Sequence, residues 1–267
     1  MDFASIFSLS FVRYALASVF FLSILSGVVG SYIVCRRMVF AAGGITHASF
    51  GGIGLAYYLG LNPTLGALAF SVATALCANW ASGRGGVRHD SAIAMLWSLG
   101  MSVGVIFLSL SPGYAPNLMG FMFGDILAVS AADVVANASM AVVSILCVVL
   151  FYRPIIYSSF DPVYAGLVGW RPSLVSAVAS VFVALAITLS IKAVGIILVL
   201  SVFTIPQSVA MCFVRTLPRI MVLSSIIALL GCLVGLILSF VFDFPSGAVI
   251  TSLLSIILLI VKLLRRS

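Results

Sequence analysis

Long apolar stretches run through almost the whole chain, and short polar joints separate them. An α-helix needs about 20 predominantly apolar residues to cross the hydrocarbon core of a bilayer. Some joints contain proline, as in Asn62-Pro63 and Leu217-Pro218, where the ring ends the preceding helix because it lacks an amide donor. The pattern predicts nine membrane-spanning helices, and eight or ten fit almost as well because boundaries are hard to place. The expected spans are residues 13–34, 38–60, 63–80, 91–110, 131–151, 173–190, 193–213, 219–241 and 246–263.

Composition supports a membrane protein. Hydrophobic residues make up 63% of the 267 positions and charged residues only 7%, whereas soluble domains carry about 25% charged residues. One globular core cannot hide so much apolar surface from water, so we expect an all-α, polytopic transmembrane bundle forming a single domain over residues 1–267. The five cysteines form no C-x-x-C pair and lie in or beside apolar runs, which is typical of buried thiols.

The basic residues predict an orientation. A net charge of +7 would suggest a nucleic-acid partner in a soluble protein, but lysine and arginine of membrane proteins gather in cytoplasmic loops. With the N-terminus outside and nine crossings, eleven of the 13 basic residues fall inside, and only Arg13 and Lys192 fall outside. The sequence therefore predicts an external N-terminus, a cytoplasmic C-terminus and no nucleic-acid partner.

The acidic residues are few. The chain has no glutamate, and its aspartates fall near the joints between expected spans. Proton-coupled carriers usually need titrating side chains within the membrane, so we expect the energy for any transport to come from elsewhere. No phosphate-binding G-x-x-x-x-G-K-[ST] loop is present. Asp125 and Asp243 lie outside in this topology, where they are expected to cap loops or to form an outer lip that guides cations.

One of the two histidines, His47, falls near the middle of the second expected span. Small residues surround it in the stretch GGITHASFGG, and such residues let a helix or an ion approach the backbone closely. Placing an ionisable group at this depth in the membrane costs free energy, and such residues usually have a function. Neutral imidazole is a common ligand of transition metals. We expect His47 to be a ligand in a transport pathway, or else a packed residue bonded to a neighbouring helix.

The seventh expected span contains Pro206 in its middle, which frees the carbonyl of Val202, and Thr204 and Gln207 flank this point. A broken helix at mid-depth exposes polar backbone to a substrate. An ordinary proline kink in a packed helix explains the pattern equally well. Thr204 and Gln207 are therefore candidates for the lining of a pathway.

The inside segment 153–172 is the longest expected cytoplasmic connection. Ser159 or Asp161 is placed to cap a short helix that begins at Pro162, because proline suits the first turn of a helix. This helix is either a docking site for a partner subunit or a helix lying on the lipid surface. Its apolar stripe consists of Val163, Leu167 and Trp170.

Six stretches resemble the membrane permease subunits of ABC transporters for zinc, manganese or iron, and their order and spacing make the likeness specific. The likeness covers nearly the whole chain. The stretches are GSYIVCRRMVFAAGGITHASFGG, HDSAIAMLWSLGMSVGVIFLS, FGDILAVS, SFDPVYAGLVGW, VGIILVLSVFTIP and FDFPSGAVI.

The resemblance implies a permease subunit of the bacterial cytoplasmic membrane that imports a divalent metal ion and is not itself an enzyme. It implies a homodimer or a pair with a related permease, fed from outside by a metal-binding lipoprotein. Cytoplasmic ATPase subunits would dock on SFDPVYAGLVGW and switch the pathway by hydrolysing ATP, and no cofactor is implied for this subunit. The coupling residues implied are Asp161, Pro162, Gly166 and Gly169.

The chain departs from these relatives at one position. Many of them carry an aspartate four residues before the histidine, and Gly43 stands at that position here. Either another helix supplies ligands, or the ion passes with more of its water, or this subunit differs in selectivity. We expect His47 to contact the metal transiently in each case.

Three other functions fit the pattern less well. A permease for an iron-siderophore or corrinoid chelate would need a wider channel and usually more spans. An ion-gradient-driven carrier would need an intramembrane acid. An intramembrane enzyme would need a nucleophile and base, and the chain shows no H-E-x-x-H motif.

Overall fold

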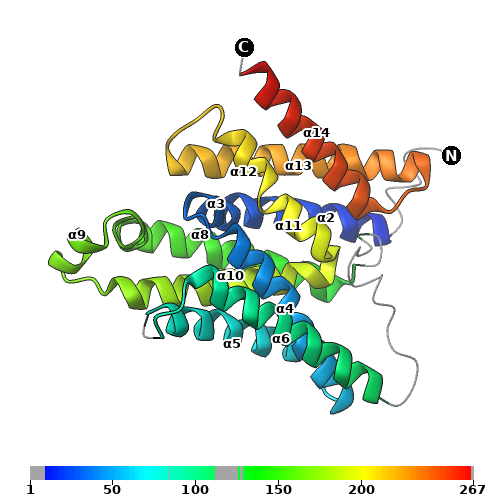
Figure 1. Ribbon diagram of the computed structural model, residues 1–267. Helices are drawn as coiled ribbons and strands as arrows, with labels where there is room; N and C mark the ends of the chain where they lie inside the picture. Colours follow the sequence, from blue (N-terminus) through cyan, green and yellow to red (C-terminus); the bar gives the residue numbers. More distant parts are fainter. Residues whose placement is uncertain (1–9, 84, 112–125, 127–128, 266–267) are drawn as a thin grey trace. The chain divides into compact units, whose positions relative to one another are not determined.

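The protein is all-helical over the residues that the computed structural model describes, namely 10–83, 85–111, 126 and 129–265. Within this part of the chain, eight helices are long and apolar enough to cross a membrane. Figure 1 shows these helices and the shorter ones between them. In chain order they are α2 (Ser10–Leu25), η1 (Ser26–Gly30), α3 (Ser31–Cys35), α4 (Val39–Tyr58), α5 (Pro63–Gly83), α6 (His89–Leu110), α8 (Ala131–Phe160), α9 (Pro162–Leu167), α10 (Pro172–Val194), α11 (Ile196–Val202), α12 (Ile205–Ala210), α13 (Leu217–Phe242) and α14 (Ser246–Leu264).

The helices belong to two compact units. Unit 1 is drawn from Met1–Cys35, Asn117–Ser144 and Leu189–Ser267. Unit 2 is drawn from Arg36–Pro116 and Ile145–Thr188. Because the boundaries fall inside α8 and α10, each of these two helices contributes to both units.

Seven of the nine expected spans correspond to helices with bounds close to those expected, and the other two, 131–151 and 193–213, differ. For residues 193–213 the sequence left open a broken helix or a proline kink, and the structure has the break: α11 ends at Val202 and α12 begins at Ile205. Pro206 lies in the first turn of α12, where its missing amide N–H breaks no intrahelical hydrogen bond. The segment is therefore a broken helix, and the turn falls at Phe203 and Thr204, before the proline.

Helix α8 is longer than expected. It continues to Phe160, so the first part of the expected cytoplasmic connection over 153–172 is helical rather than a loop. The backbone leaves helical geometry at Phe151, with φ −111° and ψ 23°, three residues before Pro154. A proline ring clashes with the carbonyl of the preceding turn, which explains a kink at this point rather than an end.

Close contact between helix backbones organises unit 2. Glycines of α4 face glycines of its two neighbours, Gly52 against Gly66 of α5 and Gly54 against Gly104 of α6. A Cβ atom built on Gly51 would lie 2.7 Å from the backbone oxygen of Gly100. Small residues drive such packing in lipid, where apolar side chains gain little by leaving the bilayer. Helix α4 is thereby held tightly between α5 and α6.

In unit 1, helices α13 and α14 run antiparallel. Gly231 of α13 meets Leu254 of α14, and Gly235, one turn later, meets Ile250, one turn earlier in α14. Figure 1 shows α2 starting at the right end of this unit and α14 finishing at its upper left. The start of α2 and the end of α14 therefore lie on different sides of unit 1.

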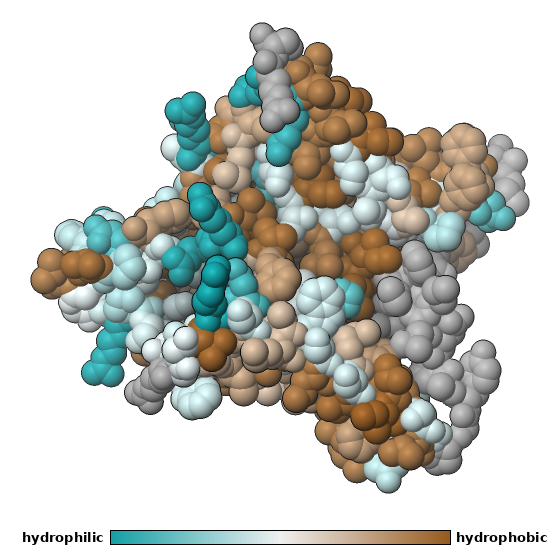
Figure 2. Space-filling view, viewed as in Figure 1, coloured by the Kyte–Doolittle hydropathy of each residue, from teal (hydrophilic) through white to brown (hydrophobic). Residues whose placement is uncertain are grey.

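Many large apolar side chains are exposed on the long helices. Figure 2 shows them over α14 at the top of the view, where few polar groups interrupt them. On α13 the exposed set includes Val222, Ile226, Leu230, Val234 and Ile237. Such a surface is stable against lipid and not against water, in agreement with the membrane location expected from composition.

The packing in unit 2 gives a first prediction. Gly52→Ala places a methyl group against the backbone oxygen of Gly66, so we expect a loss of about 1–3 kcal/mol of stability. Gly83→Ala on α5 is the matched control, because nothing lies within 4 Å of the added atom. Thermal unfolding of the detergent-solubilised protein measures both variants. Equal melting temperatures for the two would contradict the close contact between α4 and α5.

Candidate functional site

His47 lies in the middle of α4, where its side chain is half-buried. Its ring stacks on the indole of Trp97 in α6, with the ring centroids 4.6 Å apart and the planes inclined by only 7°. Phe40, two turns earlier on α4, lies 6.2 Å from Trp97 between ring centroids. The candidate ligand is therefore one member of an aromatic stack within unit 2.

The approach of α4 to α6 places these two rings. A Cβ atom on Gly100 would lie 2.6 Å from the Cα of Ala48, and Gly44 packs on the side chain of Ile93. His47 and Trp97 flank this contact, so their rings meet face to face. The ring nitrogens of an imidazole point outward in the ring plane, and stacking leaves them free. Among the described residues no hydrogen bond to His47 is found, so both nitrogens can serve an external partner.

Gly43 lies four residues before His47 on the same face of α4. The described residues contain no cluster of three or more His, Cys, Asp or Glu side chains able to hold a metal ion. Within the described chain, His47 thus offers a single imidazole rather than part of a preformed metal centre.

Thr204 lies in the break between α11 and α12, and Gln207 lies in the first turn of α12. Both belong to unit 1, whereas His47 belongs to unit 2. The Thr204 hydroxyl donates to the carbonyl oxygen of Leu200, at 2.7 Å. Gln207 is fully buried, and its Nε2 donates to the backbone oxygen of Ser26 at 2.8 Å and to the Ser26 Oγ at 2.9 Å. The Thr204 hydroxyl thus stabilises the backbone at the end of α11, and the Gln207 amide stabilises the π-helical turn η1, which begins at Ser26.

The Oε1 atom of Gln207 is buried and has no hydrogen-bond partner among the described residues. A buried amide oxygen without a partner is uncommon. On the helix that bears η1, Gly30 faces this side chain closely, so no larger residue fits there. The glutamine is a packed structural residue in this conformation, and a role in the pathway remains a prediction.

The short helix predicted at Pro162 is confirmed. Helix α9 spans Pro162–Leu167, and the Asp161 Oδ1 accepts a hydrogen bond from the Tyr164 amide at 2.9 Å, as an N-cap does. Gly166 lies inside the helix, and Gly169 follows it with a φ of +89°, a backbone conformation that favours glycine. Two apolar side chains of this segment are largely exposed, Val163 at 76% and Leu167 at 82%.

Helix α9 is braced against the end of α8. The ring of Tyr164 meets that of Tyr157 edge-on, with centroids 5.1 Å apart. A guanidinium nitrogen of Arg36, which follows α3, donates to the backbone oxygen of Ser159 in the last turn of α8. These two contacts hold α9, with its exposed Val163 and Leu167 side chains, against the end of α8.

Of the two outer-lip candidates, Asp125 lies outside the described residues. Asp243 is exposed and ends α13 in a left-handed conformation with φ 54°, while its amide bonds to the Ser239 carbonyl. This is the geometry of an ordinary helix cap. Its role in guiding cations stays a prediction.

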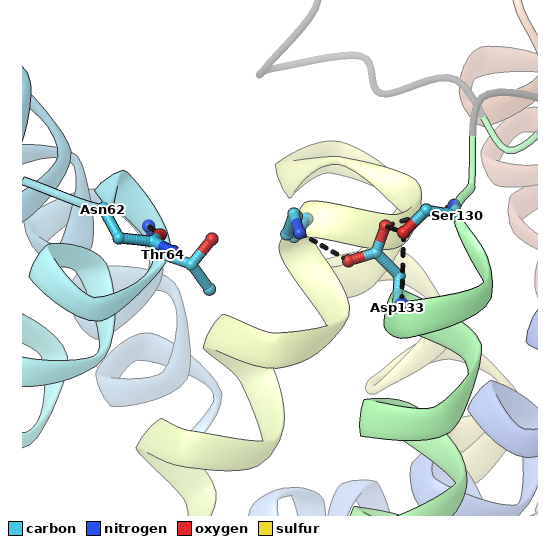
Figure 3. Close-up of polar contacts among 5 residues, drawn as sticks. Asn62, Thr64, Ser130 and Asp133 are labelled. Atoms are coloured by element: carbon cyan, nitrogen blue, oxygen red, sulfur yellow. Dashed lines mark hydrogen bonds and ion pairs between the residues drawn. The ribbon is translucent and has the colours of Figure 1, made fainter.

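Sequence reasoning missed an ion pair in unit 1. The Nζ of Lys192, near the end of α10, lies 2.7 Å from Oδ1 of Asp133 at the start of α8. The Ser130 hydroxyl donates to the other carboxylate oxygen at 2.5 Å. Figure 3 shows this cluster, and separately the Asn62 side chain that caps the start of α5 by accepting from the Thr64 amide. Lys192 was one of only two basic residues expected outside, which was the available signal that it has an acidic partner.

Sequence reasoning also missed Trp97. A tryptophan in an apolar span is ordinary, and only the close approach of α4 and α6 reveals its contact with His47.

Known proteins resemble this chain over nearly its full length. A family model described as the ABC 3 transport family matches residues 8–265. An uncharacterized membrane protein of Synechocystis sp. is 35% identical over 256 residues, which cover 96% of this chain and 91% of that protein. The manganese transport system membrane protein MntC of Listeria monocytogenes is 31% identical over 251 residues, covering 94% and 89% of the two chains.

A solved structure has the same fold. PsaBC from Streptococcus pneumoniae in complex with Fab matches with a TM-score of 0.83 and 25% identity, covering 95% of this chain and 91% of that chain. The family model spans almost every position, and the helices are those of a multi-pass membrane protein. This chain therefore belongs to the ABC 3 transport family.

Proposed function

We propose that this chain is the permease subunit of an ATP-driven importer that carries a divalent transition metal ion across the bacterial cytoplasmic membrane. Membership of the ABC 3 transport family supports the transporter class. The relative in Listeria monocytogenes is named for manganese transport, which makes manganese the first ion to test. The observation that carries the proposal in this chain is His47, a half-buried imidazole in the middle of a spanning helix with its nitrogens free.

His47 would act as a transient ligand. A neutral imidazole binds manganese, iron and zinc through a ring nitrogen. One ligand binds a divalent ion weakly, which suits a pathway because the ion must also leave. The remaining coordination positions would be filled by water or by the same residue of a second copy, since a homodimer brings two such histidines to one pathway.

Helix α9 would transmit the motion of ATPase subunits. Its exposed Val163 and Leu167 offer an apolar surface, while Asp161 and Gly169 define its two ends. Pro162 starts the helix and Gly166 keeps one position of it free of a side chain. Because the Tyr157 and Arg36 contacts fix the base of this segment, a push on α9 would reach α8 and the start of α4.

An ion-gradient-driven carrier is the weaker alternative. The aspartates in the described residues are Asp90, Asp133, Asp161 and Asp243, and each lies at or beyond a helix end. Carriers of that class usually depend on an acid within the membrane. A permease for an iron-siderophore or corrinoid chelate stays the other alternative.

We also propose one permease domain with the N-terminus outside and the C-terminus in the cytoplasm. This needs an odd number of crossings, so the α11–α12 pair would have to cross in addition to the eight long helices. The positions of the α2 start and the α14 end on different sides of unit 1 support it. An extracytoplasmic metal-binding lipoprotein would then deliver the ion on the side of Asp243, the exposed outer-lip candidate.

Replacement of the candidate ligand tests the cargo site. In the complex with its ATPase and lipoprotein, His47→Ala should lower manganese uptake at least about tenfold, because the loss of a ligand of the bound ion costs on the order of 1.4 kcal/mol or more. His89→Ala at the start of α6 is the matched control and should transport normally. Radioactive-ion uptake by proteoliposomes measures both. Normal uptake by an assembled His47→Ala complex would remove His47 from the pathway.

The docking surface is tested by Leu167→Asp. A charge on this exposed apolar position should weaken co-purification of the ATPase about tenfold or more without unfolding the permease. Leu61→Asp changes a similarly exposed leucine, 62% accessible, in the connection between α4 and α5, and should leave the ATPase bound. If both variants retain the ATPase equally, α9 is not the docking element.

Reporter fusions test the orientation. Green fluorescent protein at the C-terminus should fluoresce, because it matures in the cytoplasm, while a protease site at the N-terminus should be cut from outside intact cells. The positive-inside rule is the physical basis of this expectation. Two termini on the same side would mean that the α11–α12 pair does not cross the membrane.

A further inference from the structure

The stack of His47 on Trp97 differs from ordinary core packing. The closest contacts of α4 with α6 are made at glycines, Gly44 against the Ile93 side chain and Gly100 against the backbone of Ala48. Trp97 lies beside these contacts, half-buried. The indole is therefore not what holds the two helices together. The indole covers one face of the His47 imidazole, and the ring of Phe40 lies farther away, at 6.2 Å between centroids.

Stacking fixes the ring while it leaves the binding atoms free. The indole lies parallel to the imidazole, with the ring centroids 4.6 Å apart, and so restricts rotation of the His47 ring out of its plane. The two ring nitrogens lie at the edge of the stack. A ligand held in advance loses less conformational freedom on binding its ion. The geometry thus gives Trp97 a positioning effect on His47.

The indole also contributes electrostatically. The face of an aromatic ring carries partial negative charge and attracts a cation within about 6 Å. An imidazole that binds a divalent ion takes on part of its positive charge, so it is stabilised against the indole face. Gly43 leaves no carboxylate one turn away to play that part.

We propose that Trp97 is a positioning residue for the metal cargo: it orients His47 and stabilises the positive charge of its metal-bound form. This inference rests on the proposed function, because it requires that an ion reach His47. It assigns to an uncharged ring part of the electrostatic task that a nearby carboxylate would perform.

Uptake kinetics of the complete transporter provide the first test. Trp97→Leu should raise the apparent KM for Mn²⁺ on the order of tenfold, since the π face is lost, while maximal uptake changes little. Trp97→Phe should recover part of the affinity, because phenylalanine keeps an aromatic face with a weaker quadrupole. Trp80→Leu, an exposed tryptophan on α5, is the matched control.

A double-mutant cycle separates positioning from packing. If Trp97 acts through His47, adding Trp97→Leu to His47→Ala should change the residual uptake less than twofold. If the two effects multiply, Trp97 is a packing residue and the inference is overturned. If His47→Ala alone leaves uptake unchanged, the proposed function of His47 fails as well, which the single variant shows independently.

Fluorescence supplies a readout that does not depend on transport. In a chain with Trp80→Phe and Trp170→Phe, Trp97 is the remaining tryptophan. Paramagnetic Mn²⁺ or Co²⁺ bound to the stacked imidazole should quench its emission in a saturable manner, and His47→Ala should abolish that quenching. Equal quenching with and without His47 would contradict the inference.

Discussion

The hydrocarbon core of a bilayer offers no water, so every backbone amide and carbonyl inside it must find a partner within the protein. Regular helices meet this condition by themselves, and most of this chain consists of them. Two irregular places in the described part of unit 1, η1 and the α11–α12 break, meet it through side chains. Gln207 donates to the backbone oxygen and to the hydroxyl of Ser26, and the Thr204 hydroxyl donates to the carbonyl oxygen of Leu200. Polar residues that looked like lining for a pathway therefore first serve the backbone.

The same constraint sorts the ionisable groups. Where the structure describes aspartates they lie at helix ends, and Asp133 is paired with Lys192. His47 is different because it lies in the middle of a spanning helix, where its ring is covered by Trp97 rather than by a hydrogen-bonding partner. A neutral imidazole tolerates this position at modest cost, and it can bind a metal ion without changing its own protonation. An ion binding here would be recognised weakly and released readily.

Span positions, the Asp161 cap and the apolar stripe of α9 could be predicted from the sequence, because length, turn chemistry and exposure are local properties. The turn at Thr204 and the extension of α8 to Phe160 could not. In both, a proline marked the region, yet tertiary packing decided whether the helix ended, kinked or restarted. The partner of His47 was also hidden, because it depends on glycine contacts between α4 and α6, elements far apart in sequence. The sequence did show that Gly43 stands where many relatives carry an aspartate. The structure adds that the ring beside His47 is the indole of Trp97.

The central claim is that a lone imidazole, backed by an indole, binds the cargo inside the membrane. X-ray absorption by zinc bound to the purified permease–ATPase complex, without the lipoprotein, tests this most directly. The account predicts a nitrogen ligand at about 2.0–2.1 Å with the multiple-scattering pattern of imidazole, and loss of that pattern in His47→Ala. A zinc environment made only of oxygen ligands, or one unchanged by the substitution, would contradict it.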